Sequence, residues 1–322
     1  MERGNLGRWL LIAAGVFLLF TVGKSVFGVG EGPSQRVGAA EQRVIANPDG
    51  RPPEALCDLW SDHFHAQLTT RGASLKRFTL TTSKYRKDGK QTQVTTTPDQ
   101  EFYQQLRFHF GNRLEKSAER QVDADSMDWV LAQSDGKSCE FSYRDPKVEL
   151  TKTVKLGARP YELEITATLK NLADKPLKHA LTVHTDAWRL HHEVAGSMFK
   201  VSPLVTHVEC VANDDKVTRL LNADFEPGDF EDKQLFPTNA RNTGDWYESP
   251  GGPAVGAVSN AYFTHALAPR GSSTKGPVCQ LLIEDRWDTG RYQSIDQDPN
   301  GGSLYRVRLA YPEVTVDPGN TA

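Results

Sequence analysis

After residue 29 the sequence lacks any apolar run long enough to cross a membrane, and neither sign of charge predominates. Its 38 Lys and Arg residues nearly balance its 41 Asp and Glu residues, which leaves a net charge of −3. A membrane-spanning helix needs roughly 20 apolar residues, so residues 29–322 contain no such helix. The chain also lacks a basic stripe and an aromatic-basic platform, so we predict no nucleic-acid partner.

Reaction signatures are missing as well. The sequence contains no G-x-S-x-G elbow, no P-loop, no complete G-x-G-x-x-G and no H-E-x-x-H. We therefore predict that the chain is not an enzyme and has no catalytic, cofactor-binding or metal-binding residues.

The four cysteines form no C-x-x-C pair, which argues against zinc or thiol-redox chemistry. In an oxidising compartment four cysteines allow three disulfide pairings. We favour Cys210 with Cys279, because both lie in apolar, strand-like segments of the second half. Four buried free thiols are the alternative.

The N-terminus is the apolar part of the chain. Arg3 and Arg8 precede an apolar run from Trp9 to Gly23, which continues beyond Lys24. We predict an uncleaved transmembrane signal anchor over residues 9–29, since no small-x-small cleavage site follows closely. A cleaved signal peptide is the alternative. Either interpretation makes the remainder of the chain an exported domain.

Residues 30–55 are rich in glycine and proline among scattered charges. Such a segment buries too little apolar surface to fold, so we predict a flexible linker. An ordered domain is expected to begin at Leu56.

From Leu56 onward the hydrophobic pattern has a period of two. In Tyr161–Leu169 the odd positions are apolar and the even positions polar, which indicates a half-buried strand. Before it, Val148–Leu156 places apolar residues on one face, interrupted only by Lys152, and Gly157–Pro160 predicts the turn of a hairpin. A second hairpin is predicted around Arg71 and Gly72. Further strands are expected at Trp129–Ala132, Ser138–Tyr143, Ala180–His184, Val205–Val211, Tyr262–Leu267, Val278–Ile283 and Ser303–Tyr311.

Many antiparallel strands with one polar face predict an all-β chain built as a large β-sandwich. The segment Leu221–Gly256 is rich in Asp, Glu, Gly, Pro and Asn, and is expected to be a long surface loop.

Three weak patterns suggest ligand sites. His63 and His65 would share a face of a strand and could bind a metal, but two ordinary strand histidines are favoured, because no third ligand is nominated. The stretch His191-His192-Glu193 has the same two interpretations. A cluster of carboxylates in the long loop suggests calcium, but it lacks the ordered spacing of a calcium loop, so a solvated acidic loop is favoured. Its members are Asp224, Glu226, Asp229, Glu231 and Asp232.

A carbohydrate-binding or epimerase-like sandwich is the alternative function. It requires a histidine and a carboxylate facing one cleft, for which His184 with Glu162 or Glu164 is the candidate set. Solvent exposure on the polar face of a strand explains both glutamates without chemistry. The aromatic residues nominated for a sugar site are Trp188, Trp246, Tyr247 and Trp287.

Three blocks, in this order, resemble one known family. They are FHAQLTTRGASLKRFTL at Phe64–Leu80, RPYELEITATLKNLADKPLKHAL at Arg159–Leu181, and VGAVSNAYFTHALAP at Val255–Pro269. Together with the single leading anchor they resemble the N-terminal anchor and periplasmic domain of YidC-type membrane protein insertases.

The resemblance implies a cytoplasmic N-terminus at residues 1–8, the anchor at 9–29 and a periplasmic β-supersandwich of the galactose-mutarotase type at 56–322. It implies a location in the bacterial inner membrane, with one membrane pass in this chain and most of the chain in the periplasm. The implied role is to aid insertion and folding of integral membrane proteins, with or without the Sec translocon. The expected partners are Sec translocon components, nascent membrane proteins and, through the N-terminal helix, the lipid bilayer.

The sequence departs from the family after Val314–Ala322. In the family a Pro-Gly turn leads into a last strand and then into a five-helix insertase core, whereas here the chain stops shortly after Pro318 and Gly319. We expect a domain truncated at its C-terminal strand, with an unpaired edge. The residues expected to matter are structural: Arg71 and Gly72 at the first turn, Asn171 and Pro176 at the second, and Tyr262 and Phe263 in a late core strand.

Overall fold

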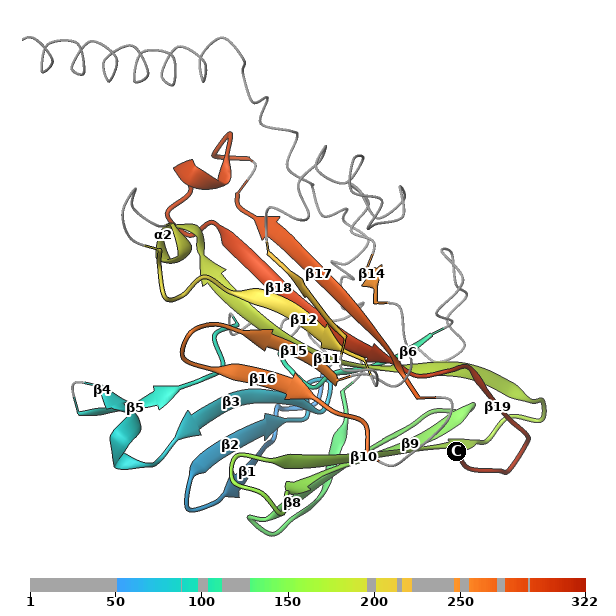
Figure 1. The fold of residues 1–322 in the computed structure, drawn as a ribbon. Helices are drawn as coiled ribbons and strands as arrows, with labels where there is room; N and C mark the ends of the chain where they lie inside the picture. Colours follow the sequence, from blue (N-terminus) through green and yellow to red (C-terminus); the bar gives the residue numbers. More distant parts are fainter. Residues whose placement is uncertain are drawn as a thin grey trace, which may run out of the picture. The chain divides into compact units, whose positions relative to one another are not determined.

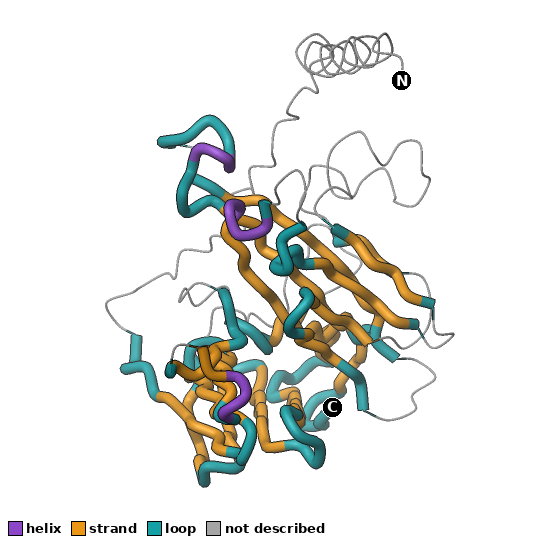
Figure 2. The backbone as a smooth tube through the Cα atoms, turned by 60° about the vertical axis from the view of Figure 1, so that its left-hand side comes forward, coloured by secondary structure: helices purple, strands orange, loops and turns teal. Residues whose placement is uncertain are grey.

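A computed structural model describes most of the chain beyond the predicted linker. The described residues are 51–87, 89–97, 104–111, 128–195, 201–212, 216–221, 246–249, 255–270, 276–288 and 290–322. They form four antiparallel sheets, and their only α-helix is the single turn α2 (His191–Val194) (Figures 1 and 2). The all-β prediction is therefore confirmed. None of the helices in these ranges is long and apolar enough to span a membrane, and the predicted anchor at 9–29 lies outside them.

The first sheet has the order β1-β2-β3-β5-β4. Its strands are β1 (Leu56–Trp60), β2 (Phe64–Thr69), β3 (Ser74–Leu80), β4 (Arg86–Lys87) and β5 (Lys90–Gln93), with a 3₁₀ turn, η2 (Ser83–Tyr85), before β4. The predicted hairpin between β2 and β3 is present. Gly72 in its turn has a φ of 66°, a conformation that costs a residue with a side chain about 1–2 kcal/mol.

The second sheet has the order β10-β9-β8-β7. It contains β7 (Val130–Ser134), β8 (Ser138–Arg144), β9 (Val148–Leu156) and β10 (Leu163–Asn171). The predicted β9–β10 hairpin is confirmed, with Leu156 paired to Leu163. Its turn is longer than expected, because Tyr161 lies in the turn with a φ of 64° and not in the strand.

The third and fourth sheets are built mainly from the second half of the described chain. The third has the order β14-β17-β18-β11-β19, with β6 also paired to β11. Its strands are β6 (Phe108–Gly111), β11 (Leu177–Leu190), β14 (Tyr247–Glu248), β17 (Val278–Arg286), β18 (Gly302–Ala310) and β19 (Val314–Val316). The fourth sheet, β13-β12-β15-β16, contains β12 (His207–Val211), β13 (Val217–Leu220), β15 (Val255–Ser259) and β16 (Thr264–Leu267). A second 3₁₀ turn, η5 (Ile295–Gln297), precedes β18.

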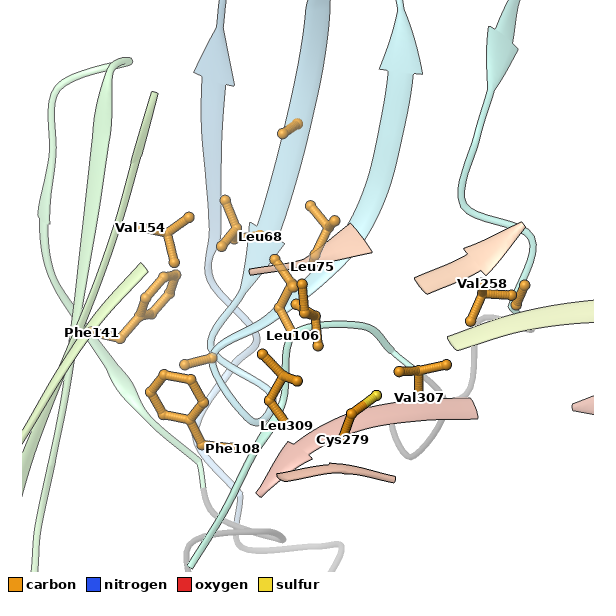
Figure 3. Close-up of a cluster of buried hydrophobic side chains, with 14 of the residues drawn as sticks. Leu68, Leu75, Leu106, Phe108, Phe141, Val154, Val258, Cys279, Val307 and Leu309 are labelled. Carbon is orange, nitrogen blue, oxygen red and sulfur yellow. The ribbon is translucent and has the colours of Figure 1, made fainter. Parts of the chain in front are cut away.

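One hydrophobic core joins all four sheets. Leu68, Phe141, Leu309 and Val258 come from the first, second, third and fourth sheets, and their side chains belong to the same buried cluster (Figure 3). The alternating pattern of the strands supplies these residues, because side chains two positions apart point to the same face. The four sheets therefore share their buried face and form one sandwich-like domain.

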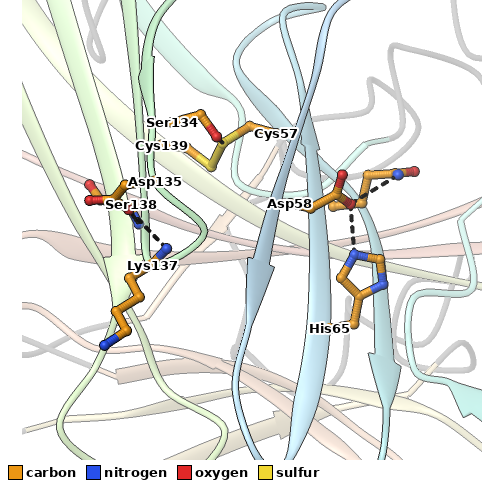
Figure 4. The surroundings of a disulfide bond; sticks show 9 residues. Cys57, Asp58, His65, Ser134, Asp135, Lys137, Ser138 and Cys139 are labelled. Carbon is orange, nitrogen blue, oxygen red and sulfur yellow. Dashed lines mark hydrogen bonds and ion pairs between the residues drawn. A yellow bond between two sulfur atoms is a disulfide. The ribbon is translucent and has the colours of Figure 1, made fainter.

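Two disulfides connect the sheets. Cys57 of β1 is bonded to Cys139 of β8, which joins the first sheet to the second (Figure 4). Cys210 of β12 is bonded to Cys279 of β17, which joins the fourth sheet to the third. The latter pair is the one favoured from sequence. The alternative of four free thiols is wrong, because the structure contains no free cysteine.

The C-terminal residues are paired with the domain. β19 pairs with β11, and after Pro318 and Gly319 the backbone of Ala322 exchanges two hydrogen bonds of 2.9 Å with Leu169 of β10. The residues after the Pro-Gly turn therefore already add to the edge of β10. Thr321 forms an isolated bridge with Lys170, the described residues contain no strand after β19, and the truncation of the last strand stays a prediction.

Candidate functional site

A group of buried polar and charged side chains lies on one face of the third sheet. Arg306 of β18 is paired with Asp186 of β11, and Arg308 is paired with His184 of β11 and Gln280 of β17. Because alternate residues share a face, these side chains lie on the face opposite Tyr305, Val307 and Leu309, which join the core. We call this set the charged face: His184, Asp186, Gln280, Glu284, Arg306 and Arg308.

Ion pairs connect the acids and bases of the charged face. Arg306 lies between the two carboxylates, with Nε 3.5 Å from Asp186 Oδ1 and Nη1 3.6 Å from Glu284 Oε2. Arg286 approaches the same Glu284 oxygen at 3.2 Å. Buried charges are tolerated only when they are paired, and Asp186 and Arg306 are only 1% and 4% exposed. Removing either partner would leave an uncompensated buried charge.

Asp186 is the most perturbed acid of this face. Its burial raises the pKa from 3.8 to about 6, although the charge of Arg306 opposes the shift. A carboxyl group with this pKa exchanges a proton near neutral pH, which an ordinary aspartate does not do. Such shifts are frequent at functional sites, although structural ion-pair networks also produce them.

Trp246 lies over the basic members of the charged face. The Arg308 guanidinium is 4.0 Å from the centre of the indole, and the Arg306 guanidinium is 5.3 Å away. The His184 ring approaches the same indole edge-on, with centroids 5.7 Å apart. Trp246 therefore stabilises two cations through its π face. Arg308 also donates a 2.6 Å hydrogen bond to Gln280.

A second buried charge lies outside the charged face. Lys152, which interrupts the apolar face of β9 in the sequence, is fully buried and donates hydrogen bonds to the carbonyls of Ala73 and Leu106. Its Nζ also lies 4.0 Å from the centre of the Phe108 ring. Burial, together with the charge of Arg107, lowers the pKa of Lys152 well below 10.5. The side chain connects β9 to two segments of the chain that do not pair with it.

The predicted sugar-epimerase set is not brought together. Glu164 forms ion pairs with Lys155, at 3.0 Å, and with Arg270, and Glu162 accepts a hydrogen bond from the backbone of Arg159 in the turn. The carboxylates that share a face with His184 are Asp186 and Glu284. The sequence feature that could have indicated this grouping is the alternation along β11, which places residues 184 and 186 on the same face of the sheet.

The nominated aromatic residues divide between two faces. Trp188 alternates with His184 and Asp186 along β11, so it lies on the charged face together with Trp246. Tyr247 is paired with Leu281 and belongs to the hydrophobic core. Trp287 directly follows β17. Only part of the nominated set is therefore assembled in one place.

The two histidine patterns make contacts within the domain. His65 bonds Asp58 at 2.6 Å and stacks on Trp60, whereas His63 lies against Tyr161. In the described part of the chain, no three His, Cys, Asp or Glu side chains are grouped so as to hold a metal. Residues 191–193 form α2, where His191 pairs with Asp296 at 2.5 Å. The acidic cluster at 224–232 lies outside the described residues.

The first pair of predicted structural residues stabilises the first turn. Arg71 donates to Asp128 at 2.5 Å and to the carbonyl of Pro52 at 2.8 Å. Burial raises the pKa of Asp128, but hydrogen bonds from Arg51 and Arg71 outweigh it, so the pKa lies below its ordinary value. The Gly72 turn stands next to Arg107, whose Nε would be 2.9 Å from an added Cβ.

Asn171 and Pro176, the second pair of predicted structural residues, lie in different environments. Asn171 is fully buried, and its side chain donates to the carbonyls of Lys175 and Val316, both at 2.8 Å. It thereby fixes both the turn after β10 and the last strand. Pro176 is exposed just before β11.

The third pair was placed incorrectly from sequence. Tyr262 is 63% exposed and lies with Phe263 in the turn between β15 and β16, not in a core strand. Asn260 causes this arrangement, because its side-chain oxygen accepts hydrogen bonds from both backbone amides and closes the turn. Phe263 does pack against the core from this position.

Comparison with known proteins decides the family. The model of the YidC periplasmic domain matches residues 57–322. The chain belongs to this family. The resemblance noted from three sequence blocks is thereby confirmed, and residues 57–322 form a periplasmic domain of the YidC type. No curated protein sequence matches the chain.

Solved structures similar to this YidC-type domain include galactose mutarotase-like proteins. One is a galactose mutarotase related enzyme from Lactobacillus acidophilus, with 9% identity, coverage of 83% of this chain and 94% of that chain, and a TM-score of 0.44. Another is a galactose mutarotase-like protein from Lactobacillus casei, with 13% identity, coverage of 83% and 97%, and a TM-score of 0.41. A third, from Clostridium acetobutylicum, has 8% identity, coverage of 84% and 96%, and a TM-score of 0.37.

Proposed function

We propose that the chain is the membrane-anchored periplasmic part of a YidC-type insertase and aids the insertion and folding of integral membrane proteins. The observation that carries the proposal is the family match over residues 57–322. In this proposal the apolar run at 9–29 anchors the chain in the bacterial inner membrane with residues 1–8 in the cytoplasm. The ordered domain then lies in the periplasm.

The disulfides support export. All four cysteines are paired, and the two disulfides join the first sheet to the second and the fourth sheet to the third. Disulfides persist in the periplasm and are rare in the cytosol.

The role is one of binding and not of bond chemistry. The charged face has internal partners for its ions, and its geometry is that of a packed network. We propose Sec translocon components and nascent membrane proteins as the partners. The surface through which they bind is expected among the exposed residues of the domain.

Association with the translocon tests the proposal. The full chain and a variant lacking residues 56–322 are expressed with an affinity tag after residue 8, and translocon subunits are quantified after mild detergent extraction. We expect recovery with the full chain and loss with the variant. Equal recovery of translocon subunits with both would contradict a docking role for the domain.

One observation favours a second candidate, carbohydrate binding. Trp188, Trp246 and Arg308 are only partly buried and lie on one face, and aromatic rings beside hydrogen-bonding groups are the side chains that bind sugars. Calorimetric titration of the full chain in detergent with common hexoses and disaccharides tests it. Heat that disappears in Trp246→Ala would support this candidate, and absence of heat across the set would refute it.

A further inference from the structure

Three turns gather at one end of the first two sheets. The β1–β2 hairpin ends at Trp60 and His65, and the β9–β10 hairpin ends at Leu156 and Leu163. The Tyr161 ring in the second turn lies 5.2 Å from the His63 ring in the first. The same ring lies 6.3 Å from the Tyr85 ring, just before β4. The segment leading into the β4–β5 hairpin therefore meets the other two turns at one place (Figure 1).

Aromatic side chains at this end are presented to solvent. Trp60 is 58% exposed and Tyr161 is 38% exposed. Trp60 is held in place, because its ring stacks on His65 at 3.7 Å with only 7° between the planes, and Asp58 fixes that histidine. The exposed indole is thus oriented by the domain and is not a loose surface side chain.

The backbone at Tyr161 adds an independent observation. Its φ of 64° lies in the left-handed region, where a residue with a side chain pays a cost that glycine avoids. The chain nevertheless has a tyrosine at this position. Strained residues of this kind are concentrated at functional sites, and the Tyr161 ring approaches the core residue Phe64 in a tilted arrangement at 6.5 Å.

Exposed cations lie on the same segments of the chain as these aromatic rings or next to them. They are Lys84 in η2, Arg86 and Lys90 in the β4–β5 hairpin, and Arg159 in the β9–β10 turn. Lys84 lies 4.6 Å from the centre of the Tyr85 ring. Asp62 is the exposed acid of the β1–β2 turn. We call this surface the basic-aromatic end, defined by Trp60, Tyr161, Lys84, Arg86, Lys90 and Arg159.

We propose that the basic-aromatic end docks on an anionic lipid surface. Trp and Tyr favour the interface between lipid and water, where an apolar ring and a polar tip are both satisfied. Lysine and arginine beside them are attracted to negatively charged headgroups, each by about 5-fold in affinity. The combination fits a headgroup layer, because the cations and the aromatic side chains are exposed on turns and a short hairpin at one end of the first two sheets.

Crosslinking to lipid in reconstituted vesicles tests this inference. The full chain carries the photoreactive residue p-benzoylphenylalanine in place of Tyr161 and is placed in vesicles of phosphatidylcholine, alone or mixed with phosphatidylglycerol. A second variant carries the photoreactive residue in place of Val314 and is the reference, because Val314 is 42% exposed and its strand lies beside the opposite end of β10. Lipid adducts are quantified by mass spectrometry.

The expected result is more lipid adduct from position 161 than from position 314, and only when phosphatidylglycerol is present. A triple variant, Lys84→Glu, Arg86→Glu and Lys90→Glu, should lower the adduct at position 161 by at least about 10-fold. The matched control reverses the charge of three exposed lysines at the opposite end of the second sheet, Lys147→Glu, Lys170→Glu and Lys175→Glu. This control should leave the amount of lipid adduct at position 161 unchanged.

Equal adducts at positions 161 and 314, or equal adducts with and without phosphatidylglycerol, would overturn the proposal. Crosslinking of position 161 to a second copy of the chain in place of lipid would overturn it as well. The triple variant is excluded if its disulfides and its urea transition show that it does not fold. In that case the proposal is decided by whether the lipid adduct at position 161, without the three charge reversals, depends on phosphatidylglycerol.

Discussion

Replacing Asp186 by asparagine should change how the stability of the domain depends on pH. Asp186 is buried on the charged face and its pKa is raised to about 6. The folded domain therefore holds this proton more tightly than the unfolded chain does. Stability contributed by the protonated group is fully present below a pH of about 4 and is lost as the pH rises through 6.

The size of the effect follows from the shift. A difference of about two pKa units corresponds to about 3 kcal/mol between the ends of the window. Asparagine has nearly the same shape and does not titrate. The free energy of unfolding of Asp186→Asn, relative to the unaltered chain, should thus rise by about 3 kcal/mol between pH 4 and pH 8, whatever constant offset the lost pairing with Arg306 introduces.

Urea unfolding followed by tryptophan fluorescence at several pH values measures this difference. Asp128→Asn is the matched control, because the pKa of Asp128 lies below 3.8, so the stability of this variant relative to the unaltered chain should stay nearly constant between pH 4 and pH 8. Parallel stability curves for Asp186→Asn and the unaltered chain would refute the claim that burial raises the pKa of Asp186.

Three further changes have expected outcomes. Lys152→Met removes a buried amine whose pKa is lowered. The unaltered chain should therefore gain stability as the pH rises toward 10.5, by up to about 1.4 kcal/mol per pH unit, whereas the variant should not. Urea unfolding between pH 7 and 10 tests this difference. Cys210→Ala with Cys279→Ala opens a loop with a sequence separation of 69, and should cost about 4 kcal/mol by loop entropy, read from the urea midpoint against the unaltered chain. Gly72→Ala should lower the free energy of unfolding by about 1–2 kcal/mol because of its φ of 66°, and further because the added Cβ displaces Arg107. Gly136→Ala should cost less, because its added Cβ meets nothing within 4 Å. Equal losses of stability in the two variants would contradict the close approach of Arg107.

The hairpins were predictable because their information is local. In β9 and β10 the alternation of apolar and polar residues predicts both the strand and the face that is buried. The turn at Gly72 is likewise predicted by a residue that tolerates a positive φ. The pairing of Cys210 with Cys279 was favoured for a related reason, since both lie in apolar strands.

The charged face was not predictable, because it depends on which strands become neighbours. Asp186, Glu284 and Arg306 are far apart in the sequence and meet only through the order β17-β18-β11. Lys152 was interpreted as a break in an apolar face, yet its Nζ reaches two carbonyls across the core. Tyr262 was placed with Phe263 in a core strand, whereas Asn260 closes a turn there.

Crosslinking during membrane protein synthesis tests the central claim most directly. The full chain, with photoreactive residues at exposed positions of the domain, is expressed in cells, and a multi-spanning membrane protein is pulse-labelled and irradiated. A YidC-type insertase domain predicts adducts with the labelled membrane protein that appear early and decay during the chase. Adducts that are absent, or that form equally with a soluble exported protein, would contradict a role in membrane protein insertion.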